Sequence, residues 1–81
     1  MDVVSLVEMK TGQSGQIKQI YGGHGMVARL QALGIHPGKR VTKLSAVFHK
    51  GPVVLEIDRS QVALGYGQAN NIFVEIEVRK G

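Results

Sequence analysis

The chain has 81 residues, a net charge of +4 and no cysteine, which suits one domain and excludes a disulfide framework or a thiolate metal site. A small domain without disulfides is typical of a reducing compartment, so we expect a cytoplasmic protein. Asp2 stands where an export signal would carry positive charge, and no apolar run approaches the roughly 20 residues of a membrane-spanning helix. We therefore expect one soluble domain over residues 1–81.

The charge is unevenly distributed along the chain. Residues 1–50 hold seven Lys and Arg residues against two acidic residues, whereas residues 51–81 hold three against four. This asymmetry predicts an acidic or phosphate-bearing partner for the first half, and the alternative is an ordinary solvated surface.

The first half predicts one strand and one helix. Residues 16–21 lie between glycines, and Ile17 and Ile20 fall on opposite sides of a regular strand, which indicates a bulge or a sharp bend. Met26, Leu30 and Leu33 then recur at i, i+4 and i+7, which predicts a helix over about residues 25–33. We expect this helix to bury that face and to plug one open end of a barrel.

The segment RLQALGIHPGKRV, residues 29–41, predicts how the helix ends. If Gly34 adopts the left-handed conformation, Ile35 packs back on Leu30 in a Schellman-type stop, and Pro37 prevents continuation. Gly38 completes a turn into the next strand.

The second half predicts further strands and fixes the fold class. Val41 and Leu44 break alternation, residues 53–58 and the segment SQVALG form a hairpin around Asp58–Ser60, and residues 72–79 alternate cleanly. Residues 66–71 predict a turn or a short helical turn. The sum is a mainly β, small SH3-like barrel of about five strands with one inserted α-helix; an oligonucleotide-binding barrel is the alternative.

The sequence lacks the residue patterns of common enzymes. It has no glycine-rich phosphate loop, no Gly-x-Ser-x-Gly elbow and no His-Glu-x-x-His pair. His24, His36 and His49 are too far apart to preform a metal face, although one of them with Glu56 or Glu75 could hold ferrous iron or zinc weakly. We expect no enzymatic activity and leave the metal site unassigned.

The aromatic residues do not complete a nucleic-acid site. Tyr21, Phe48, Tyr66 and Phe73 are scattered, and we expect no stacking cluster among them, so a pI near 9.8 is the main cue for nucleic acid. Phe73 lies on the face opposite Ile72 and Val74, where it either packs beneath a neighbouring segment or contacts a protein partner.

The order of motifs resembles the FeoA family of small proteins of bacterial ferrous iron uptake. The most specific match is Arg29, Leu30, Leu33 and Gly34 through Gly38, followed by GPVVLEI and VALGYGQANNIFV. One departure is Arg59, where the family pattern leads us to expect glycine in the hairpin turn.

The resemblance implies a non-enzymatic accessory protein that docks on the cytoplasmic GTP-binding part of the FeoB permease. The candidate contacts lie on the helix and its flanking loops: His24, Met26, Arg29, His36, Lys39 and Arg40. A metal-sensing regulatory barrel, similar to the C-terminal barrels of iron-dependent repressors, and a nucleic-acid-binding barrel stay open as alternatives. A homodimer, formed through an edge strand or through Phe73, also stays open.

Overall fold

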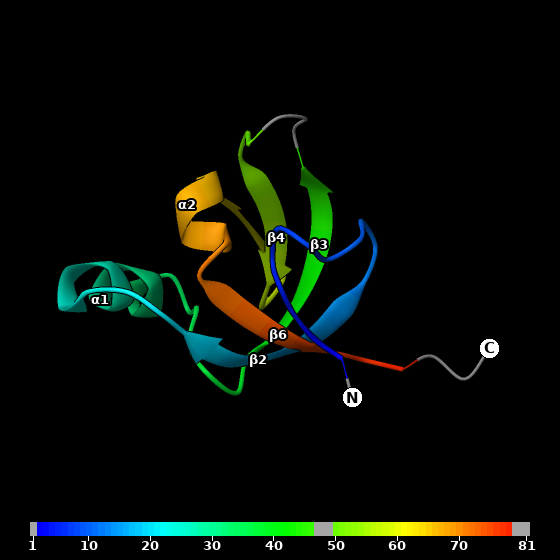
Figure 1. Cartoon of the computed structure of the whole chain (residues 1–81), viewed down its shortest axis with the longest axis horizontal. Coiled ribbons are helices and arrows are strands. Elements are labelled where there is room, and N and C mark those ends of the chain that lie inside the picture. The colour runs from blue at the N-terminus through cyan, green and yellow to red at the C-terminus, as the bar shows by residue number, and fades with distance from the viewer. Residues whose placement is uncertain (1, 47–49, 79–81) are drawn as a thin grey trace.

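A computed structural model of the chain describes residues 2–46 and 50–78. These residues form six strands and two short helices (Figure 1). In chain order the elements are β1 (Val3–Ser5), β2 (Ser14–Ile20), α1 (His24–Ala32), β3 (Arg40–Ala46), β4 (Val53–Ile57), β5 (Ser60–Leu64), α2 (Tyr66–Ala69) and β6 (Ile72–Ile76).

The six strands form one antiparallel sheet that curls into a small barrel (Figure 1). Its strand order is β1-β6-β2-β3-β4-β5. The predicted mainly β, SH3-like fold is confirmed, as are the inserted helix and the short helical turn near residue 66. The additional strand is β1, which spans three residues only and is therefore too short to show an alternating pattern in the sequence.

Both predicted irregularities occur in the sheet. The register of β2 against β6 shifts between Ile17 and Gln19, and the register of β3 against β4 shifts between Lys43 and Ser45. Each shift moves the following side chains to the other face and increases the local twist. Two bends of this kind allow short strands to curl around a common core.

The core is a single apolar cluster with contributions from strands, helices and connecting segments. It contains Leu6, Met9, Ile17, Leu30, Ile35, Val41, Val53, Leu55, Ile57, Leu64, Ala69, Ile72 and Val74. Burial of each large aliphatic side chain stabilises the fold by about 1.5–3 kcal/mol. A contiguous cluster of this size lets an 81-residue chain fold without disulfides.

Lys43 is buried at the inner side of β3, with 3% of its surface exposed. Its Nζ donates hydrogen bonds to the carbonyl oxygens of Val7 (2.9 Å) and Met9 (2.5 Å). Both residues belong to a single helical turn after β1, in which the Met9 N–H donates to the Ser5 carbonyl at 3.0 Å. The ammonium therefore fastens the segment after β1 to the barrel wall, a role that a count of surface charges does not reveal.

The β4–β5 hairpin has the tight turn that the sequence predicts. Ile57 pairs with Ser60, and the two residues between them, Asp58 and Arg59, both have positive φ, at 50° and 66°. Two consecutive left-handed residues define a type I′ turn. Arg59 thus occupies a position that favours glycine, and the hairpin tolerates the resulting strain.

The end of α1 is a Schellman motif, as predicted. Gly34 has φ +84°, its N–H donates to the Gln31 carbonyl at 2.9 Å, and the Ile35 N–H donates to the Leu30 carbonyl at 2.8 Å. The side chains of Leu30 and Ile35 are both fully buried. The chain reversal therefore fixes the C-terminal end of α1 to the core.

The prediction that α1 plugs the barrel and buries Leu33 is wrong. α1 projects sideways from the barrel (Figure 1), Leu30 is its one buried residue, and Leu33 is 50% exposed. The reason is that the reversal at Gly34 returns Ile35 to the core. Ile35, which is fully buried, takes the place in the core that the sequence pattern assigned to Leu33.

Gly34→Val should destabilise the fold by about 1–2 kcal/mol, because a β-branched residue is strained at positive φ. The space itself is adequate, since an added Cβ would meet Ile57 and Asp58 at ordinary distances of 3.7 and 3.8 Å. Urea denaturation measures the difference. Gly25→Ala, also in α1 and with open space around its Cβ, is the control and should be neutral or stabilising by up to about 1 kcal/mol.

Lys43→Met should destabilise the fold by about 1–2 kcal/mol, because the carbonyls of Val7 and Met9 lose their donor. Burial lowers the pKa of Lys43 below its ordinary 10.5. The unfolded chain then binds this proton more tightly, so the stability of the wild type relative to Lys43→Met should rise as pH increases from the lowered pKa towards 10.5. A relative stability that falls over this interval would contradict the assignment.

Candidate partner-binding surface

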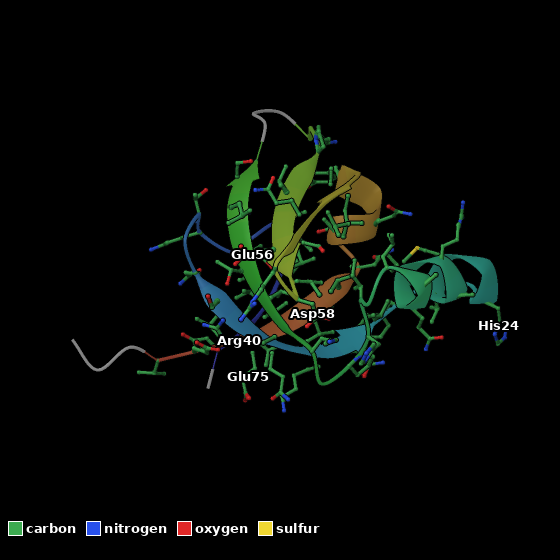
Figure 2. The ribbon with its side chains drawn as sticks, turned by 180° about the vertical axis from the view of Figure 1, so that it is seen from behind. His24, Arg40, Glu56, Asp58 and Glu75 are labelled. Carbon is green, nitrogen blue, oxygen red and sulfur yellow. The ribbon has the colours of Figure 1, made fainter. Side chains whose placement is uncertain are left out.

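Three of the six candidate contact residues belong to α1. His24 is the first residue of the helix and lies at its far end from the barrel (Figure 2). Arg29 is exposed in the last turn, where its charge is favourable at the helix C-terminus. Met26 is half-buried, packs against the core, and lies so close to Gly22 that an added Cβ there would be 2.7 Å from Met26 Cε. His24 and Arg29 are thus available for contact, whereas Met26 mainly supports the helix.

His36 and Lys39 bracket the turn that follows α1. The Lys39 N–H donates to the His36 carbonyl at 3.2 Å, and Gly38 between them has φ +96°, which is the type II geometry that follows proline. The Nδ1 of His36 lies 3.0 Å from the Pro37 carbonyl oxygen. Lys39 forms an ion pair with Asp58. Both side chains are therefore engaged within the protein.

Arg40 lies on the barrel wall, on the other side of the molecule from His24 (Figure 2). Its Nε donates to Glu77 Oε1 at 2.5 Å and its Nη2 to Glu77 Oε2 at 3.1 Å. The hydrogen bond and the charge of Glu77 raise the pKa of Arg40 above its ordinary value. The six candidates therefore do not form one continuous surface, and the exposed residues His24 and Arg29 lie on α1.

Ion pairs neutralise part of the positive charge that the sequence concentrates in residues 1–50. The Nζ of Lys18 lies 3.6 Å from Glu75 Oε1. Lys39 forms an ion pair with Asp58, and Arg40 forms one with Glu77. Each pair joins a cation of the first half to a carboxylate of the second half. The fold thus interleaves the two halves, and these three cations do not contribute to a basic face.

Among the described residues Tyr21 and Phe73 form an aromatic pair, although not a stacking cluster. Their rings meet edge to face, with centroids 5.5 Å apart and planes at 86°. Tyr21 is 57% exposed and Phe73 is half-buried. The residues are distant in sequence, and the pairing of β2 with β6 brings them together. Phe73 therefore packs partly against Tyr21, and the two rings form an exposed apolar site that the sequence did not reveal.

The described residues contain no group of three or more His, Asp or Glu that could hold a metal ion. His24, Glu56 and Glu75 lie apart (Figure 2). His49, which the sequence offered as a weak metal ligand with Glu56 or Glu75, lies outside the described residues.

No helix within the described ranges is long and apolar enough to cross a membrane. The longest, α1, has nine residues.

A family model described as the FeoA domain matches residues 4–76. The chain belongs to the FeoA family. It is 36% identical over 67 residues to a protein named Fe(2+) transport protein A from Methanocaldococcus jannaschii, and this match covers 82% of our chain and 78% of that protein.

Solved FeoA structures share the fold over nearly the whole chain. A crystal structure described as the iron uptake regulatory protein FeoA superposes with a TM-score of 0.85 at 30% identity, covering 95% of this chain and all of that one. An FeoA-like protein from Clostridium acetobutylicum gives a TM-score of 0.83 at 16% identity, which shows the fold alone. A manganese-dependent transcriptional repressor gives 0.85 at 24% identity, but the match covers only 42% of that longer chain.

The projection of α1 predicts opposite outcomes for two leucines three residues apart. Leu30→Ala should destabilise the fold by about 2–5 kcal/mol, because it leaves a cavity in the core. Leu33→Ala should change the free energy of unfolding by no more than about 0.5 kcal/mol, because this side chain is half exposed. Thermal or urea denaturation measures both. A large loss for Leu33→Ala would mean that the helix packs across the barrel after all.

Proposed function

We propose that this protein is a non-enzymatic accessory protein of ferrous iron uptake that acts in the cytoplasm. The observation that carries the proposal is the match of the FeoA model to residues 4–76, supported by a fold that covers the whole of an FeoA crystal structure. The relative from M. jannaschii, which is named for Fe(2+) transport, supports the same role.

The partner in this proposal is the cytoplasmic GTP-binding part of an FeoB-like permease. Because family membership does not place the docking surface, we assign it from exposure and charge. The exposed residues of α1 include a cation, Arg29, and two alanines, Ala28 and Ala32, and the half-exposed Leu33 follows as the C-cap residue. Arginine is one of the residue types enriched among the few side chains that dominate the binding energy of protein interfaces.

The mode of attachment also favours α1 as the docking element. The helix is fixed to the barrel through Leu30, Met26 and the reversal at Gly34, so its outward residues are displayed without contributing much to stability. A preorganised helix lowers the entropic cost of association. We therefore assign the docking surface to α1, and we exclude Lys39 and Arg40 from its centre because carboxylates already pair with them.

Arg29→Glu should weaken capture of the permease GTP-binding domain at least about tenfold, because a reversed charge opposes an acidic partner surface. Biolayer interferometry with the domain loaded with GTP or GDP measures the affinity. Unfolding midpoints should be unchanged, since Arg29 is exposed and forms no ion pair with another described residue.

Lys10→Glu is the matched control for this measurement. It reverses the same charge at an exposed residue of the turn over residues 10–13, which lies at the opposite side of the barrel from α1 (Figure 1). Capture should be retained. Equal losses for both variants would indicate nonspecific charge attraction, and absence of capture in every nucleotide state would count against the permease as partner.

A metal-sensing regulatory barrel is the second candidate, because the fold also matches part of a manganese-dependent transcriptional repressor and of IdeR from T. acidophilum. Those identities, 24%, 23% and 20%, show the fold alone. Under this alternative the protein would bind ferrous iron, with zinc as a surrogate, in anaerobic calorimetry without any permease present. A nucleic-acid-binding barrel has less support, because ion pairs neutralise three of its cations.

A further inference from the structure

The curled sheet ends in two strands, β1 and β5, that pair on one side only. β1 is three residues long, and short edge strands are a common protection against unwanted pairing. β5 is five residues long, and Ser60, Gln61 and Ala63 in it are exposed. The two edges are therefore not equivalent, and β5 offers the longer free edge.

The hairpin register identifies the backbone groups that face outward from β5. A two-residue turn closes on a hydrogen-bonded pair, here Ile57 with Ser60, and hydrogen-bonded pairs then alternate along an antiparallel ladder. Val62 consequently bonds to Leu55, whereas the N–H and C=O groups of Gln61 and Ala63 point away from β4. No hydrogen bond that the described residues form outside the ladders uses these four groups.

β5 also lacks the usual protection of an edge strand. It contains no charged residue and no proline, and its register against β4 is continuous, without a bulge. A long, uncharged and regular edge is a template for pairing with a further strand.

We propose that β5 pairs with β5 of a second copy of this chain, antiparallel and around a two-fold axis at Val62. This register places Gln61 opposite Ala63 of the second copy and Ala63 opposite Gln61 of the second copy. All four outward groups on each chain then form hydrogen bonds, and Val62 meets its own symmetry mate in the non-bonded position, as an isologous dimer requires. The proposal goes beyond the docking function and does not depend on it.

The uncharged sequence of β5 does not oppose a second copy as the occupant. No charged side chain of β5 faces its own copy, because the strand reads Ser-Gln-Val-Ala-Leu. Arg59, next to β5 in the chain, would lie about 20 Å from Arg59 of the second copy, six strand positions away, which is beyond the screening length of about 8 Å at physiological salt. Two five-residue strands bury less than a standard interface, so the dimer is reversible and depends on concentration.

Sedimentation of the purified full chain, without any permease component, tests the proposal. The weight-average mass should rise from monomer towards dimer between micromolar and millimolar concentrations. A mass that stays monomeric over this range overturns the proposal. Capture of the permease domain by the β5 edge of a chain that stays monomeric also overturns it.

Two double variants test the register. Gln61→Lys with Ala63→Lys sets lysine opposite lysine at both bonded pairs and should abolish the dimer. Gln61→Lys with Ala63→Glu sets lysine opposite glutamate and should retain it. Both variants share the Gln61→Lys change, so its effect on Glu56, which pairs with Gln61 across the hairpin of the same molecule, is matched between them. Circular dichroism confirms folding. Equal behaviour of the two variants overturns the proposal.

A thiol supplies a second readout, because the chain contains no cysteine. Val62→Cys should form a cross-linked dimer on mild oxidation, since residue 62 faces its own copy. Gln61→Cys should not, since residue 61 faces Ala63. Cross-linking of Gln61→Cys alone would indicate a different register and would overturn the proposed one.

Discussion

The chain reversal at Gly34 is the constraint on which the arrangement of the molecule depends. The left-handed glycine allows the Ile35 N–H to reach the Leu30 carbonyl, and both side chains enter the core. One end of a nine-residue helix is thereby fixed, which compensates for a length at which an isolated helix is unstable. Because Ile35 takes the core position, the rest of α1 is left outside the barrel, where a partner can reach it.

Ion pairs between the two halves of the chain determine the charge of the barrel wall. Lys18, Lys39 and Arg40 face carboxylates of the second half, so the barrel wall carries mixed charges with little net field. Exposed ion pairs of this kind add little stability. They engage three cations of the first half, whereas Arg29 on α1 is exposed and belongs to none of these pairs.

The two ends of the sheet differ because different interactions hold them. The segment after β1 is fixed to the barrel wall by Lys43, whose ammonium bonds to the carbonyls of Val7 and Met9. β5 pairs with β4 alone in the sheet, and its Leu64 is buried in the core. One edge is thus short and fastened, whereas the other is longer, exposed and uncharged, which is why we assign self-association to β5 and docking to α1.

The sequence by itself determined the local structure: the helix stop at Gly34, the hairpin at Asp58–Arg59, the two irregular strands and the mainly β class. These features depend on backbone preferences and on side-chain alternation within a few residues, which the sequence displays directly. Only the tertiary structure decided that Leu33 is exposed, that Lys43 is buried and that Tyr21 meets Phe73. Each of these outcomes depends on strand register and on competition between side chains for one core, and residues far apart in the chain set both.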